Sequence, residues 1–131
     1  MIGLDTNILV RYLTQDDPVQ AHQATEVIEQ RLTEAEPGFI SMVAMVEMVW
    51  VLGRYYRFAS EQIANVTERI LQAETLVVEG ERDVFAAMTA LRDGRGEFAD
   101  ALIGALSTNA GCSRVLTFDR RALRLPYFAL P

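Results

Sequence analysis

The sequence predicts an α/β fold: a three-layer α/β/α sandwich around a short, mostly parallel central sheet. Two observations predict this class. Short apolar segments typical of strands alternate with amphipathic helical segments along the chain, and capping or turn residues separate them. Strands that alternate with helices indicate parallel pairing through right-handed crossovers, with helices on both faces of the sheet. A length of 131 residues predicts one domain, residues 1–131.

The first half of the chain opens with a short apolar segment and a helical one. Asp17-Pro18 is a helix start, because Asp is a favoured cap and Pro is tolerated at the first helical position, and Pro37-Gly38 ends that helix. Ser41 provides a cap for a strongly apolar helix. We therefore expect a strand at 2–4, helices at 6–13 and 18–32, a strand at 39–40 and a helix at 42–56.

The second half continues the alternation. Ser60 is a candidate cap for the next helix, Gly94-Arg95-Gly96 is a flexible break, and Gly111 ends the last long helix. We expect a helix at 61–71, a strand at 76–78, helices at 81–92 and 98–109, and a strand at 114–118 that is followed by a polar turn.

The composition excludes several kinds of site. All 12 basic residues counted as Lys or Arg are Arg, so phosphate loops and Schiff bases that need lysine are excluded. One His and one Cys exclude zinc cages and internal disulfides. A net charge of −6 argues against a surface that coats nucleic acid. The chain has no basic leader before Asp5 and no long apolar run, so we expect a cytoplasmic protein that does not enter a membrane.

Four acidic residues are expected at one edge of the sheet. Asp5 and Asp119 follow the ends of strands, and Asp100 lies in the first turn of a helix that leads into a strand. Glu47 lies about six residues into a helix that leaves a strand, and helical side chains lean toward the helix start. Ligands of parallel α/β sheets gather at this carboxyl edge.

A group of like charges needs a compensating partner. Two carboxylates about 4 Å apart repel by roughly 4 kcal/mol at an effective dielectric near 20. Oxygen ligands without imidazole or thiolate select Mg²⁺ or Mn²⁺. Such an ion activates water and aligns the oxygens of a phosphodiester, so the acids predict metal-assisted phosphodiester hydrolysis.

Each acid also has a structural explanation. Asp5 could cap the first helix, Asp100 could stabilise the start of its helix through the helix dipole, and Asp119 could be an ordinary turn residue. Glu47 is the strongest candidate. Its neighbours one helical turn away, including Val43 and Trp50, are apolar, so the sequence favours a buried position, and a buried carboxylate needs a partner.

The chain resembles the PIN-domain family, specifically the VapC-type toxin ribonucleases of prokaryotic toxin–antitoxin pairs. The resemblance spans the whole chain in the family's order and spacing. It is carried by Ile2-Gly-Leu-Asp5-Thr6-Asn7-Ile-Leu-Val10, the lone Glu47 in an apolar helix, Phe98-Ala-Asp100-Ala-Leu-Ile103 and Val115-Leu-Thr117-Phe-Asp119-Arg120. Each motif alone is weak, whereas the set of four is specific.

This resemblance implies an Mg²⁺- or Mn²⁺-dependent endoribonuclease that leaves 5′-phosphate and 3′-hydroxyl ends. It implies Asp5, Asp100 and Asp119 as ligands of the ion or its waters, and Glu47 as a ligand or water-orienting base. Supporting polar roles fall to Thr6, Asn7, Thr117 and Glu97, the last being longer by a methylene than the additional acid of many relatives. It also implies homodimers and a small VapB-like antitoxin, through which any contact with DNA would be indirect.

Contacts with RNA or antitoxin are expected from arginines and from the aromatic residues of the apolar helix, for which packing in the core is the alternative. Arginine donates to phosphate through a planar fork, and aromatic side chains are enriched at protein contacts and can stack on bases. The candidates are Arg11, Arg54, Arg57, Arg92, Arg95, Arg120, Arg121, Trp50, Tyr55 and Tyr56. Two other functions remain open: an RNA-processing nuclease without antitoxin, and a catalytically silent module whose acidic edge docks a basic peptide.

Overall fold

The structure is a computed structural model that describes all 131 residues, and these form two compact units. Unit 1 contains Met1–Ala59 and Arg69–Glu79, and unit 2 contains Ser60–Glu68 and Gly80–Pro131. Helix α4 (Ser60–Gln72) therefore contributes residues to both units. None of the helices is long and apolar enough to span a membrane.

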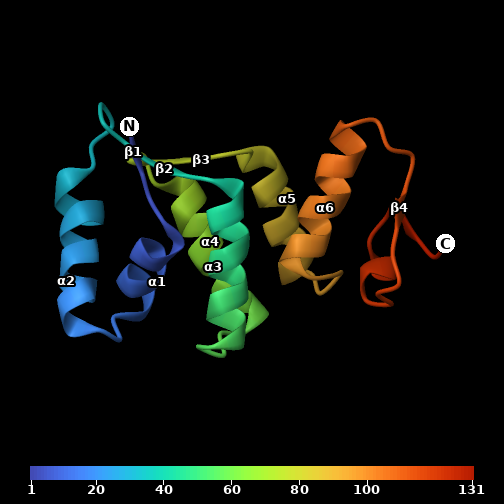
Figure 1. Cartoon of the computed structure of the whole chain (residues 1–131), viewed down its shortest axis with the longest axis horizontal. Helices are drawn as coiled ribbons and strands as arrows, with labels where there is room; N and C mark the ends of the chain where they lie inside the picture. Colours follow the sequence, from blue (N-terminus) through green and yellow to red (C-terminus); the bar gives the residue numbers. More distant parts are fainter. The chain divides into compact units, whose positions relative to one another are not determined.

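Unit 1 is built on a parallel sheet in the order β1-β2-β3 (Figure 1). Its strands are β1 (Ile2–Gly3), β2 (Gly38–Ile40) and β3 (Leu76–Val78), and Phe39 of β2 pairs with Gly3 on one side and Val77 on the other. The helices of this unit are α1 (Thr6–Thr14), α2 (Pro18–Glu26) and α3 (Met42–Arg54). A single π-helical segment, η1 (Val27–Arg31), continues α2. The core gathers buried side chains of β2 and α3, namely Ile40, Met45, Met48 and Leu52.

Unit 2 is built on two packed helices, α5 (Glu81–Arg92) and α6 (Phe98–Asn109), with Val84, Met88, Phe98 and Leu102 buried in its core. The chain then forms β4 (Val115–Leu116), the 3-10 turn η2 (Ala122–Arg124) and β5 (Phe128–Ala129). Strands β4 and β5 pair in parallel, with Val115 opposite Phe128. A Cβ atom at Gly104 of α6 would lie 3.0 Å from the ring of Phe128, so this glycine allows the close approach of β5 to α6.

Several predicted elements are confirmed, and others are corrected. Strand β3 and helices α5 and α6 have the predicted bounds. The helix expected at 18–32 ends at Glu26 and continues as the π-helical segment η1. Instead of four strands in one central sheet, the structure has five strands in two sheets, and β5 was not predicted. The strand expected at 114–118 is shortened to β4, because the Thr117 hydroxyl accepts the Asp119 backbone N–H and turns the chain.

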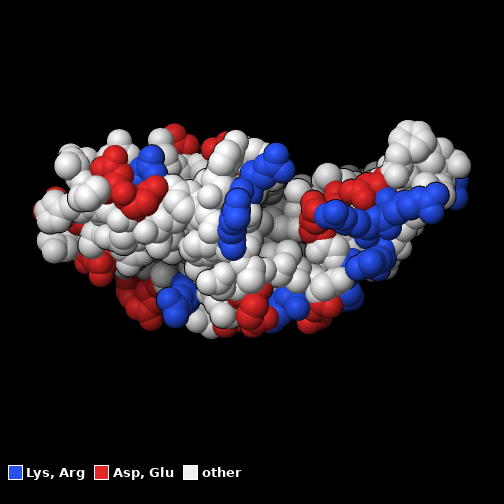
Figure 2. Space-filling view, turned by 90° about the horizontal axis from the view of Figure 1, so that it is seen from below, with Lys and Arg blue, Asp and Glu red and all other residues white.

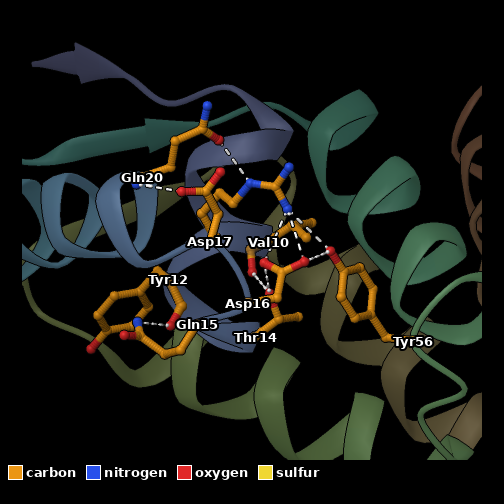
Figure 3. Close-up of polar contacts among 9 residues, drawn as sticks. Val10, Tyr12, Thr14, Gln15, Asp16, Asp17, Gln20 and Tyr56 are labelled. Atoms are coloured by element: carbon orange, nitrogen blue, oxygen red, sulfur yellow. Dashed lines mark hydrogen bonds and ion pairs between the residues drawn. The ribbon is translucent and has the colours of Figure 1, made fainter.

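A polar cluster in unit 1 ties α1 to the end of α3 (Figure 3). Arg11 donates to Asp16, Gln20 and the hydroxyl of Tyr56, and Tyr56 itself donates to Asp16 at 2.5 Å. Asp16 also accepts from the hydroxyl of Thr14. The hydrogen bond from Tyr56 is the main cause that lowers the pKa of Asp16 below its ordinary value, and Thr14 and Arg11 act in the same direction.

Replacing Tyr56 with Phe should raise the pKa of Asp16, because it removes the largest of these stabilising contacts. Because the pKa of Asp16 is lower in the folded protein than its ordinary value of 3.8, the ionised carboxyl stabilises the folded state above about pH 3.8. This stabilisation is lost as the pH falls through the pKa of the folded state. Tyr56→Phe should therefore bring acid destabilisation to a higher pH. A titration of the Asp16 carboxyl by NMR measures the change, and Tyr127→Phe, at an exposed tyrosine outside the cluster, is the control.

Candidate functional site

Asp5 lies where β1 passes into α1, and it caps that helix. Its Oδ1 accepts the backbone N–H of Thr6 at 2.7 Å, so the capping explanation from the sequence is confirmed. Thr6 is buried beneath this turn, whereas Asp5 and Asn7 are exposed. The cap occupies one carboxylate oxygen, which leaves Oδ2 available for another ligand.

Glu47 lies in the middle of α3, but its expected shielding from solvent is wrong. Its side chain is exposed, and so are its neighbours on the same stripe of the helix, Val43 at 75% and Trp50 at 56%. The expectation assumed that apolar neighbours mark a buried face, whereas the solvent-facing side of this helix is itself apolar. The Glu47 carboxylate forms no hydrogen bond or ion pair, so it is free to bind an exogenous group.

Asp100 lies in the first turn of α6, as predicted. Its pKa is raised above the ordinary value, first by desolvation and then by the nearby carboxylates of Asp119 and Glu97. No hydrogen-bond donor or cation acts in the opposite direction. Asp100 is therefore a carboxylate whose negative charge is uncompensated within the protein.

Asp119 lies in a tight turn just beyond β4. Its backbone N–H donates to the Thr117 hydroxyl at 2.9 Å, and its Oδ1 accepts the backbone N–H of Arg121 at 2.9 Å. The Thr117 N–H in turn donates to the carbonyl of Ala129, next to the β4–β5 pair. These three contacts orient the Asp119 carboxylate and leave its Oδ2 uncommitted.

Glu97 precedes α6 and forms an ion pair with Arg121, with 3.0 Å between Oε1 and Nη1. Acidic and arginine side chains lie against one another over the C-terminal part of the chain in Figure 2. Glu97 is thus close enough to Asp100 to raise its pKa, and it already has a cationic partner.

Unit 2 brings three of the predicted residues together, because Asp119 and Glu97 both act on the charge of Asp100. Asp5 and Glu47 belong to unit 1, and it stays a prediction that they act with Asp100 and Asp119. Neither unit contains a group of three or more His, Cys, Asp or Glu side chains spaced to bind a metal ion unaided. A magnesium ion does not need such a cage, because it keeps several waters and usually binds one or two carboxylates plus substrate phosphates.

The donor chemistry fits a hard divalent cation. The available donors in unit 2 are oxygens, the free Oδ2 of Asp119 and the carboxylate of Asp100, and those in unit 1 are also oxygens, the free Oδ2 of Asp5 and the carboxylate of Glu47. A cation beside Asp100 would offset the repulsion from Asp119, whose carboxylate has no ion pair in the protein. Oxygen donors of this kind favour Mg²⁺ or Mn²⁺ over zinc or copper.

The candidate contact residues fall into two groups. The side chains of Arg54, Trp50 and Tyr55 are exposed at α3 and just after it. The rings of Trp50 and Tyr55 pack edge to face, with 5.5 Å between their centroids. Arg120 is exposed beside Asp119, and Arg95 is exposed with an ion pair to Asp93. Arg11 differs from these, because its guanidinium is already bound to Asp16, Gln20 and Tyr56.

The contact between Glu97 and Arg121 was not predicted from the sequence. Arg121 is one of several arginines after the motifs, and nothing in the sequence distinguishes it from Arg120. The available signal was the spacing Asp119-x-Arg121, because Asp often accepts the backbone N–H two residues further on. That spacing predicts the turn, although it does not predict where the guanidinium lies.

The α/β fold and the order of the acidic positions define a known class of protein. A model of the PIN domain matches residues 2–126, so the chain belongs to the PIN-domain family, and the resemblance predicted from the sequence is confirmed. Among characterised proteins, the chain is similar to the VapC ribonuclease of Aquifex aeolicus (strain VF5). The two are 28% identical over 128 residues, which cover 95% of this chain and 91% of that protein.

Proposed function

We propose that this protein is a metal-dependent endoribonuclease and the toxin of a toxin–antitoxin pair. Membership of the PIN-domain family and similarity to a VapC ribonuclease support this function. The observation that carries it is the uncompensated charge of Asp100 beside Asp119 and Glu97, since carboxylates grouped in this way favour a divalent cation. The match over residues 2–126 supports a single PIN-like domain at 1–131.

Four carboxylates carry the proposed chemistry. Asp5, Asp100 and Asp119 would bind Mg²⁺ or Mn²⁺ or its waters, and Glu47 would serve as a ligand or orient the attacking water. When bound, such an ion lowers the pKa of a coordinated water and stabilises charge on the phosphodiester oxygens. The protein orients these groups through the cap at Thr6 and the turn at Thr117, and Asn7 and Glu97 are further polar supports.

The proposed partners are RNA, a VapB-like antitoxin and a second copy of the chain, all in the cytoplasm, with DNA reached only through the antitoxin. Exposed arginine and aromatic side chains support contacts with RNA or antitoxin at Arg54, Arg95, Arg120, Trp50 and Tyr55. Arg11 belongs to this set with less support, because its guanidinium is occupied within unit 1. Exposed apolar side chains on α5 and α6 support a homodimer: Phe85, Ile103 and Leu106.

Removal of divalent metal should abolish cleavage of RNA. Purified protein is incubated with RNA in EDTA and again after addition of Mg²⁺ or Mn²⁺, and we expect products only with added metal. Calorimetry with Mn²⁺ should show uptake by the wild type and weaker uptake by Asp5→Asn and Asp119→Asn. Glu81→Gln is the matched control, because Glu81 is an exposed acid at the start of α5 with no hydrogen bond or ion pair.

The same assay separates the alternatives. Equal cleavage by the wild type and both Asp variants would indicate a contaminating nuclease. Absence of cleavage of any RNA, with antitoxin binding intact, would favour a docking module for a basic peptide. Cleavage by the wild type that an equimolar antitoxin suppresses would favour the toxin over an RNA-processing enzyme.

A further inference from the structure

Arg121 is fixed to two acidic residues of unit 2 through different parts of its structure. Its backbone N–H donates to Oδ1 of Asp119, and its guanidinium contacts Oε1 of Glu97 at 3.0 Å. The backbone contact sets where the side chain begins, and the ion pair sets where the guanidinium lies. A cation is therefore placed beside Glu97, one of the two carboxylates that raise the pKa of Asp100.

The two contacts of Arg121 differ in permanence. The Asp119 contact is part of a turn that also includes the Thr117 hydroxyl. The ion pair joins two largely solvent-exposed side chains, 73% exposed for Arg121 and 59% for Glu97, and such pairs contribute little to stability. The guanidinium can consequently change partners while the turn and the Asp119 carboxylate stay in place.

Other arginines of unit 2 have different partners. Arg92 is more buried and contacts Glu61, Glu68 and Asn65 of α4, which is a structural arrangement. Arg95 pairs with Asp93 in the same loop. Arg121 is the arginine of this unit whose ion-pair partner is one of the predicted site residues.

We propose that Arg121 binds a backbone phosphate of the RNA next to the scissile bond, and that Glu97 holds the guanidinium at this place until the phosphate replaces it. The inference rests on the proposed ribonuclease function. An RNA strand must bring negative phosphates close to a group of carboxylates, and this approach requires a cation at the edge of the group. Arginine suits the task because its planar fork donates two parallel hydrogen bonds to phosphate oxygens.

The test measures RNA binding rather than turnover. A fluorescently labelled single-stranded RNA of mixed sequence is titrated with the full-length protein in EDTA over a series of salt concentrations around 0.15 M, where the screening length is about 8 Å, and anisotropy reports binding. We expect Arg121→Gln to weaken binding about five- to tenfold and to reduce the slope of log affinity against log salt by about 0.7, the loss of one phosphate contact. The variant keeps the backbone N–H to Asp119, and an unchanged thermal midpoint confirms its fold.

Arg114→Gln is the matched control. Arg114 precedes β4, at the end of the strand opposite to Asp119, and its exposed side chain has no ion pair. Its replacement removes the same charge and should change affinity less than about twofold, because a net charge change far from the site acts only through salt-screened attraction. Equal weakening by Arg121→Gln and Arg114→Gln would overturn the proposal.

A double-mutant cycle tests the part played by Glu97. Glu97→Gln releases the guanidinium and should tighten RNA binding several-fold, and in the Arg121→Gln background the same substitution should have a clearly smaller effect. An equal gain in both backgrounds would show that Glu97 acts only as a general negative charge, which overturns its holding role.

Parallel cleavage with Mg²⁺ separates this inference from the function on which it rests. Cleavage by the wild type together with unchanged RNA binding by Arg121→Gln would refute the inference and leave the ribonuclease standing. A wild type that neither binds nor cleaves RNA would refute both.

Discussion

Replacing Asp100 with Asn should reduce RNA cleavage about a thousandfold, which corresponds to ~4 kcal/mol of lost transition-state stabilisation. The amide keeps the size of the side chain but removes the charge that a divalent cation requires. Glu81→Gln is the control, because Glu81 is an exposed acid of the same unit with no hydrogen bond or ion pair. Initial rates with a defined RNA under saturating Mg²⁺ measure the effect, and comparable rates for the two variants would remove Asp100 from the active site.

The same substitution should stabilise the protein at neutral pH. Because the pKa of Asp100 is higher in the folded protein than its ordinary value of 3.8, folding favours the protonated carboxyl. The resulting stabilisation is present below about pH 3.8 and is lost as the pH rises through the pKa of the folded state. The wild type therefore carries an unfavourable charge at pH 7 that Asp100→Asn lacks. Thermal midpoints of the two proteins should differ at neutral pH and converge in acid, and loss of activity with a gain in stability is expected of a residue kept for function.

Replacing Phe98 with Ala should destabilise the protein by about 3–5 kcal/mol, a large part of the roughly 5–15 kcal/mol that holds a typical domain folded. Phe98 is only 2% exposed, at the first position of the helix whose first turn contains Asp100. Truncation would leave a cavity beneath that turn. Urea denaturation followed by circular dichroism measures the loss.

Phe118→Ala is the matched control for this core substitution, because the ring of Phe118 is 87% exposed. Its effect should stay within about 0.5 kcal/mol. Similar losses for the two phenylalanines would contradict the packing described for α6.

The sequence predicts elements well where chemical signals mark both ends. Helix α5 begins after Gly80, which adopts a left-handed conformation, and ends before Gly94, which does so too. Strand β5 lacks such signals, since it has two residues and follows Pro126 and Tyr127. Its formation depends on pairing with β4 and on the space that Gly104 leaves for Phe128. The residues next to β5 in the sequence indicate neither of these contacts.

The candidate site follows the same division. The positions of Asp5, Asp100 and Asp119 at element ends could be predicted, because each is set by a local boundary. The exposure of Glu47 could not, since an apolar helix face normally indicates the core and here part of it faces solvent. The direction of the Arg121 side chain depends on the conformation of a turn and on a residue 24 positions away in sequence.

Pairing of β5 with β4 gives the far C-terminal residues an influence on chemistry that their distance from every motif would not suggest. The carbonyl of Ala129 anchors Thr117, whose hydroxyl orients Asp119, whose carboxylate in turn fixes Arg121. Removing the last few residues, or fusing an affinity tag to them, would weaken this series of hydrogen bonds, which begins at the carbonyl of Ala129.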